Sequence, residues 1–167
     1  MINAQNTILL ISVIIVSFLL YAIFFYQKRR IKKQMSLILS IFDKAPIGFY
    51  TVNKDGFIDS FNQKMLEING AKSPKEVIGL NIFTLPSYQK SGLDILIRRG
   101  LNSGQPFDVE TDFISYIGGK ESIRHYVAVP LMSKDGQTVE RMLLMVEDMT
   151  EKKHLEKELK SRQEATR

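Results

Sequence analysis

A row of three carboxylates is the first feature whose residue types could do chemistry. Asp108, Glu110 and Asp112 alternate with other residues between Pro106 and Tyr116, which predicts a strand with all three acids on one face. Carboxylates bind divalent cations, but successive residues on a strand face lie about 7 Å apart. Three acids in one strand cannot share an ion without ligands from elsewhere. A solvated strand face is therefore the better interpretation, and no metal site is predicted.

The two histidines could serve in phosphotransfer or in ligand binding. His154 lies in KKHLEKEL, without the H-E-[LF]-R sequence or the following proline expected near a phospho-accepting histidine. It is interpreted as a solvated helix position. His125 alternates with Ile123, Val127 and Val129 along a predicted strand, so its ring is expected to point into the core. There it would be either a hydrogen-bonded core histidine or a ligand contact.

No arrangement of residues indicates catalysis, and no catalytic residue is predicted. Ile117-Gly118-Gly119-Lys120 is short and lies between predicted strands, so it is interpreted as a turn rather than a phosphate-binding loop. The chain contains no Cys, which excludes disulfides, thiolate catalysis, Cys-zinc sites and cysteinyl-flavin chemistry. The chain is therefore not expected to be an enzyme by itself.

The elements that position these residues begin with an apolar stretch at residues 7–26. Thr7 to Tyr26 contains no charged residue, and as a helix it would span roughly 30 Å, the thickness of a bilayer's hydrocarbon core. A chain of 167 residues cannot bury such a helix on all sides. A cleaved signal peptide would need basic residues before the stretch and small residues after it, and neither is present. A transmembrane helix is therefore expected.

Basic residues directly after this stretch predict its orientation. They are Lys28, Arg29, Arg30, Lys32 and Lys33. By the positive-inside rule, they place the following domain in the cytoplasm and residues 1–6 outside. A single-pass cell-membrane protein is expected, with these residues also attracting anionic membrane lipid.

The net charge of +5 belongs to this basic cluster alone. Residues 1–33 contain five Lys or Arg and no acid, which leaves 18 basic and 18 acidic residues in 34–167. The rest of the chain is therefore neutral, and nucleic-acid binding is not predicted.

Apolar residues recur at helical spacing on both sides of the central domain. In the linker, residues 27–45, they form a heptad pattern that ends at Ala45-Pro46. The linker residues are Ile31, Met35, Ile38 and Phe42. They would form either a parallel dimer seam or a face packed on the same domain. In the final helix, residues 151–167, Leu155 and Leu159 lie one turn apart and would extend a seam.

The pattern between these helices predicts one α+β domain at residues 46–150. Two short strands flank Lys54-Asp55-Gly56, a hairpin signal. Three helical segments follow, beginning near Asn62, Ser73 and Gly92, and three longer strands then run to Val146. The order ββααα and βββ predicts an antiparallel sheet with the helices inserted as one block.

The resemblance to a known family rests on several short motifs. They include a G-x-I strand start at Gly56 and Ile58, Asn62 heading a helix, E-V-I-G at residues 76–79, and D-M-T-E-K-K at residues 148–153. In this order and spacing, residues 37–152 resemble a PAS domain. The resemblance implies a five-stranded antiparallel sheet with helices on one face, used for sensing or dimerisation.

Asp148 and Thr150 are the residues on which the resemblance bears most directly. By themselves, Asp148 and Glu151 form a capping box for the final helix. The resemblance implies that Asp148 and Thr150 also fasten the last strand to that helix and transfer the signal. Candidate ligand-pocket residues are Tyr50, Phe113, His125 and Val127.

The identity of a ligand or cofactor is not predicted. Haem-binding PAS domains are expected to carry a histidine on the helix before the third strand, and the segment from Gly92 to Asn102 has none. The chain has no Trp and no Cys, so flavin-type photosensing patterns are not supported.

The expected function is therefore a membrane-tethered cytoplasmic PAS module. It would couple ligand or conformational input to flanking dimerising helices, as a homodimer and without a catalytic domain. It could signal to a separate histidine kinase or another output protein. The alternatives are the sensory N-terminal portion, or a truncated form, of a sensor histidine kinase, and a scaffold that binds no ligand.

Overall fold

The computed structural model describes residues 4–165, with side chains described for residues 13–165. The chain divides into two compact units, Met1–Ile41 and Phe42–Arg167, and each is described by itself.

The first unit is formed by helix α1 (Ala4–Lys44), whose last turn belongs to the second unit. In the described part of the chain, no helix is both long enough and apolar enough to cross a membrane. The transmembrane helix expected at residues 7–26 and the single-pass localisation are therefore wrong. Helix α1 continues from the apolar stretch through the basic cluster to Lys44.

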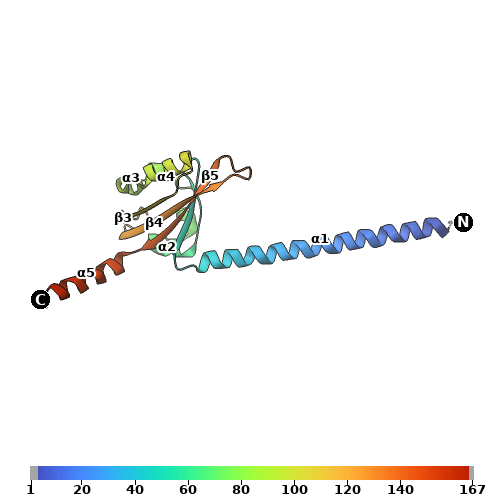
Figure 1. The fold of residues 1–167 in the computed structure, drawn as a ribbon, viewed down its shortest axis with the longest axis horizontal. Coiled ribbons are helices and arrows are strands. Elements are labelled where there is room, and N and C mark those ends of the chain that lie inside the picture. Colours follow the sequence, from blue (N-terminus) through green and yellow to red (C-terminus); the bar gives the residue numbers. More distant parts are fainter. Residues whose placement is uncertain (1–3, 166–167) are drawn as a thin grey trace. The chain divides into compact units, whose positions relative to one another are not determined.

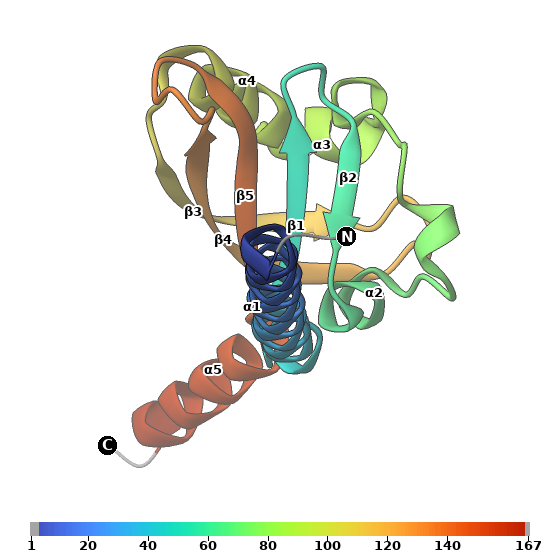
Figure 2. The same cartoon turned by 90° about the vertical axis from the view of Figure 1, so that its right-hand side faces the viewer.

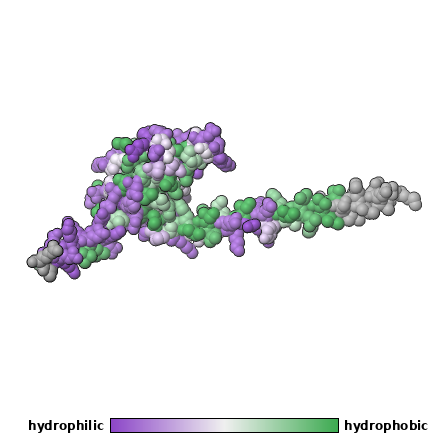
Figure 3. Space-filling view, viewed as in Figure 1, coloured by the Kyte–Doolittle hydropathy of each residue, from purple (hydrophilic) through white to green (hydrophobic). Residues whose placement is uncertain are grey.

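The membrane-orienting role expected of the basic cluster depends on that span. Its five side chains are exposed on α1, and Arg29 lies over the ring of Phe25, with its Cζ 4.7 Å from the ring centroid. Residues 1–3 of the expected outer segment, 1–6, lie outside the described residues. Figure 3 shows the described apolar residues along α1 and the largely hydrophilic surface of α5 (Thr150–Ala165).

The second unit is built on a five-stranded antiparallel sheet, part of which is labelled in Figure 1. The strand order is β2-β1-β5-β4-β3 (Figure 2). The strands are β1 (Gly48–Asn53), β2 (Ile58–Phe61), β3 (Phe107–Ile114), β4 (Glu121–Met132) and β5 (Val139–Asp148). The predicted α+β class with a five-stranded antiparallel sheet is confirmed.

The helices of this unit are inserted between β2 and β3. They are α2 (Gln63–Asn69), the 3₁₀ turns η1 (Pro74–Glu76) and η2 (Ile82–Thr84), α3 (Pro86–Ser91) and α4 (Leu93–Ser103). Helices α3 and α4 lie against one face of the sheet (Figure 2). Gly70 ends α2 in the left-handed conformation, with φ of 69°, which suits glycine.

The hydrophobic core lies between the sheet and these helices. Residues at every second position of the central strands face it, such as Tyr50 on β1, Tyr126 on β4 and Leu144 on β5. Ile82, Leu93 and Ile97 from the helical block pack against them and are fully buried. This core holds the sheet and the helical block together as one unit.

Candidate functional site

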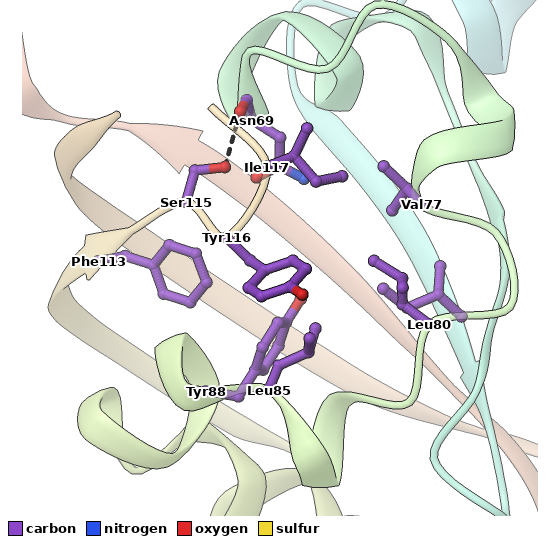
Figure 4. A pocket seen from close by; sticks show the side chains of 10 residues that line it. Asn69, Val77, Leu80, Leu85, Tyr88, Phe113, Ser115, Tyr116 and Ile117 are labelled. Carbon is purple, nitrogen blue, oxygen red and sulfur yellow. Dashed lines mark hydrogen bonds between the residues drawn. The ribbon is translucent and has the colours of Figure 1, made fainter. Parts of the chain in front are cut away.

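A small pocket opens beside the core, between α2, α3 and the turn that joins β3 to β4 (Figure 4). Its wall is largely apolar and aromatic, with Tyr88, Phe113 and Tyr116 among the lining residues and Asn69 and Ser115 as polar groups. The cavity volume is about 20 Å³, room for roughly one water molecule. In this conformation the pocket is closed to any larger ligand.

The turn between β3 and β4 closes the pocket by contact with the end of α2. The Ser115 hydroxyl donates a hydrogen bond to the backbone oxygen of Asn69 at 2.6 Å (Figure 4). A Cβ atom on Gly118 would lie 2.8 Å from that same oxygen, closer than real Cβ atoms approach. The turn can therefore rest on α2 only because residue 118 is glycine.

Arg124 lies behind the pocket wall and is fully buried. Its Nε donates to Ser122 Oγ at 2.7 Å, its Nη1 to Asn69 Oδ1 at 2.8 Å, and its Nη2 to the Ile68 oxygen at 3.1 Å. Its Cζ lies 4.3 Å from the ring centroid of Phe113, a cation–π distance. The guanidinium thus binds β4 to the C-terminal end of α2.

Sequence reasoning missed Arg124 because the opposite face of β4, with Ile123, Val127 and Val129, is the more apolar one and was expected to face the core. Ser122, Arg124, Tyr126 and Ala128 alternate with the same period as the face that contains His125. The long aliphatic part of an arginine side chain can pack in a core. The position of Arg124 on the same strand face as Tyr126 and Ala128 was therefore the sequence signal that it could be buried.

Two tyrosine hydroxyls near Arg124 lack partners. The hydroxyls of Tyr50 and Tyr126 are buried, and among described groups neither has a partner in hydrogen-bond geometry. Burial raises the pKa of Tyr50 and Tyr126, and the positive charge of Arg124 opposes part of that rise. The Arg124 side chain also lies near enough to the Tyr126 hydroxyl to lower the pKa of Tyr126 further, although the two are not in hydrogen-bond geometry. Tyr88 lies near enough to Tyr50 to raise its pKa further, although the two hydroxyls are not in hydrogen-bond geometry. These hydroxyls stay protonated at neutral pH and can donate.

The predicted pocket residues divide between the two faces of the sheet. Tyr50 and Phe113 are buried in the core, and Phe113 lines the pocket. His125 and Val127 lie on the opposite face, so the expectation that they point into the core is wrong. His125 Nε2 instead lies 2.6 Å from Asp108 Oδ1. The period of two was correct, but the assignment of faces was shifted by one residue.

The three acids of β3 are exposed, and two of them have partners. Asp108 pairs with His125, and Glu110 Oε1 lies 2.9 Å from Lys153 Nζ. Among residues whose side chains are described, no group of three or more His, Asp or Glu could hold a metal ion.

Asp148 and Thr150 form a joint, here called the exit joint, between the sheet and α5. Thr150 Oγ1 accepts a hydrogen bond from the backbone N–H of Ile123 on β4 at 3.0 Å. The Asp148 carboxylate accepts from Thr150 N at 3.1 Å and from Thr150 Oγ1 at 2.5 Å, and it pairs with Lys120 Nζ at 3.0 Å. The exit joint therefore connects β4, β5 and the start of α5.

The charge of Asp148 is favoured by these contacts. Partial burial raises the pKa of Asp148, but hydrogen bonds from Thr150 and Lys120 outweigh burial and lower it below its ordinary value. The exit joint is therefore a charge-assisted contact at neutral pH.

Asn62 forms a second joint, here called the entry joint, where the chain enters the sheet. Its Oδ1 accepts from Phe49 N at 2.8 Å and Met65 N at 3.0 Å. Its Nδ2 donates to the backbone oxygens of Phe42 and Ile47, both at 2.9 Å. The sequence predicted the cap of α2 but not the bonds to Phe42 and Ile47. With two accepted and two donated bonds, this buried amide is fully satisfied.

The predicted seam residues have two different environments. Phe42, in the second unit, stacks on Phe49 with ring centroids 5.6 Å apart. The others are exposed on α1 or α5: Ile31, Met35, Ile38, Leu155 and Leu159. A dimer seam at these residues stays a prediction.

The comparisons with known proteins identify the fold. A family model described as "PAS fold" matches residues 42–154. None of the curated proteins searched matches the chain. The PAS domain of an HTR-like protein from Haloarcula marismortui is similar, with 17% identity, a TM-score of 0.59, and coverage of 74% of this chain and 98% of that chain.

Two further solved structures agree with this match. The PAS domain of BvgS from Bordetella pertussis has 18% identity and a TM-score of 0.57, covering 80% of this chain and 98% of that chain. A domain of a sensory box sensor histidine kinase/response regulator from Geobacter sulfurreducens has 18% identity and a TM-score of 0.55, covering 69% and 94%. With the five-stranded sheet and the family match over most of its length, the chain belongs to the PAS family, whose domains are sensory, non-catalytic modules.

Proposed function

We propose that this PAS domain transmits a change in its core, caused by a ligand or by a conformational input, to the helices that flank it. The chain would act in signal transduction as a homodimer, with α5 as its output and no catalysis of its own. The observation that carries this proposal is the exit joint, in which Thr150 binds β4 and Asp148 at once.

The hairpin of β3 and β4 supports a direct route from pocket to exit joint. Ser115 closes the pocket, and its backbone N–H donates to the Lys120 oxygen at 2.9 Å. Lys120 in turn pairs with Asp148. A movement of this turn therefore displaces a direct partner of the exit joint. Such coupling requires that the input favours one arrangement of the turn over the other.

The exposed leucines of α5 support a homodimer. Leu155 and Leu159 are 52% and 61% exposed and lie one turn apart. The helix has 16 residues and no buried side chain, and isolated helices of this length are marginally stable in water. A second copy of α5 would cover both leucines, and the register between the two helices would carry the signal.

Cysteine cross-linking can test the coupling, because the chain has no cysteine of its own. We expect Leu155→Cys to form an intermolecular disulfide on mild oxidation, and the control Lys157→Cys, on another face of α5, to form much less. Adding Thr150→Val should change the cross-linking rate at position 155 severalfold. Thr150→Ser keeps the hydroxyl and should not. Equal rates in the valine and serine variants would contradict the coupling.

A second candidate function is that of the sensory portion of a sensor histidine kinase. It is favoured by the fold similarity to a domain of a sensory box sensor histidine kinase/response regulator. The mass of the protein isolated from its own cells tests this candidate. A mass well above the 19.2 kDa of this chain would favour it, and a mass of 19.2 kDa would favour a separate output protein.

A further inference from the structure

Arg124 is a buried positive charge that pairs with no acid among the described residues. Among described residues, the buried polar or charged ones are Asn62, Ser115, Ser122 and Arg124. No ion pair found among described side chains includes Arg124. A buried charge is costly unless it is paired, so the absence of an acid requires an explanation.

The present partners of the guanidinium are neutral. The hydrogen-bond acceptors are the hydroxyl of Ser122, the side-chain amide of Asn69 and the backbone oxygen of Ile68. The ring of Phe113 lies over the guanidinium and is also uncharged. The C-terminal end of α2 adds only part of a negative charge. A guanidinium has five N–H groups, and three are used by these bonds. Both charge and donors therefore remain for an anion.

Asn69 separates this guanidinium from the pocket. Its side chain lines the pocket and accepts from Arg124, while its backbone oxygen accepts from Ser115 on the closing turn. Figure 4 shows Asn69 beside Ser115 and Ile117 at the pocket wall. Lifting the turn from α2 would break only the bond to the Asn69 backbone oxygen and enlarge the pocket, while the Asn69 side chain would still cover Arg124.

Building on the proposed function, we propose that the pocket binds a small molecule with an apolar body and a carboxylate, and that the carboxylate replaces the Asn69 side chain on Arg124. The wall of Tyr88, Phe113 and Tyr116 suits an apolar or aromatic body. A carboxylate matches the planar fork of a guanidinium and accepts two bonds from it. The unpartnered hydroxyls of Tyr50 and Tyr126 supply further donors in the same core.

Binding of benzoate and benzamide to the full 167-residue chain tests the charge directly. The two probes have nearly the same shape, but only benzoate is an anion. Isothermal titration calorimetry at neutral pH should give benzoate an affinity at least about tenfold higher, the equivalent of one bidentate charge-assisted contact. Benzoate should also raise the melting temperature of the chain with increasing concentration.

Two variants of the pocket wall, Asn69→Ala and Ser115→Ala, distinguish the effect of exposing the Arg124 charge from the effect of opening the pocket. Asn69→Ala removes the group that competes for Arg124, so benzoate should bind severalfold tighter and benzamide should not. Ser115→Ala releases the turn but leaves Arg124 covered, so both probes should gain equally. Arg124→Lys keeps a charge but loses the fork, and it should abolish most of the preference for benzoate. If Arg124→Lys does not fold, the comparison of Asn69→Ala with Ser115→Ala still tests the carboxylate assignment.

Equal affinities for the two probes, binding of neither, or equal gains in Asn69→Ala would overturn the carboxylate assignment. None of these results affects the comparison of Thr150→Val with Thr150→Ser, which uses no ligand. That comparison alone bears on the proposed coupling, so failure of one proposal can be distinguished from failure of the other.

Discussion

The entry joint and the exit joint each fasten a flanking segment of the chain to the sheet, but they do so with different chemical groups. The entry joint is one buried, uncharged amide whose four hydrogen bonds all go to backbone groups. The exit joint is partly exposed and charged, and it uses the side chains of Asp148, Thr150 and Lys120. A buried neutral joint resists change in salt and pH, whereas an exposed charged joint responds to both. The difference indicates a fixed entry and an adjustable exit.

Removal of the entry amide should have the largest effect. Asn62→Ala removes four side-chain hydrogen bonds, two to N–H groups and two to carbonyl oxygens, which should lower the free energy of unfolding by about 3 kcal/mol. Asn62→Asp keeps the two acceptor bonds but loses both donors. Urea denaturation of the full chain measures both changes. A loss below 1 kcal/mol for alanine would mean that water replaces the amide and that the entry joint is not fixed.

Removal of the threonine hydroxyl at the exit should cost less. Thr150→Val deletes the acceptor for Ile123 N and the donor to Asp148, a loss of about 1 kcal/mol. Hydrogen exchange of the Ile123 amide should accelerate, while that of the Met65 amide at the entry joint should not change. Equal acceleration of both amides would show that the joints open together and would remove the contrast between them.

Acid should weaken the exit joint alone. The pKa of Asp148 is lowered in the folded chain, so its contribution to stability is present above the ordinary aspartate pKa near 4 and is lost as pH falls through the lowered value. Asp148→Asn should therefore reduce the fall in stability between about pH 4 and pH 2. Thermal melts over this range measure the effect, with Asn62→Ala as the control, which should lower stability equally at every pH.

Loss of the lysine partner should have the smallest effect. Lys120→Met removes an ion pair whose lysine is 48% exposed, and such pairs contribute at most about 1 kcal/mol. The difference between this variant and the parent chain should vanish in 1 M salt, where screening already removes the attraction. A difference that persists in high salt would indicate that the lysine stem acts by packing instead.

The sequence predicted the sheet because its signals were local. Glycine turns and a period of two define strands without reference to distant residues, and Asn62 was identified as a helix cap for the same reason. Its bonds to Phe42 and Ile47 were not predictable, because they join residues separated by 20 and 15 positions. The pocket likewise depends on Ser115 meeting Asn69, 46 positions away.

Two errors have physical causes as well. In β4 the inner face was assigned from the apolar residues Ile123, Val127 and Val129, whereas the buried face is the one that includes Arg124. For α1, length and hydropathy over residues 7–26 predicted a transmembrane span, whereas no helix in the described part of the chain is long and apolar enough to cross a membrane. Patterns along one segment of sequence thus identified helices and strands correctly, but they did not correctly identify what surrounds each helix or strand face.

In the turn between β3 and β4, different atoms hold the turn against α2 and line the pocket. The contact with α2 is made by the backbone of Gly118 and the hydroxyl of Ser115, while the side chains of Tyr116 and Ile117 line the cavity. Substitution of Tyr116 or Ile117 would therefore alter which molecules enter the pocket, while the contact of Ser115 and Gly118 with α2 stays the same. Selectivity can diverge at these two positions without redesign of the mechanism that opens the pocket.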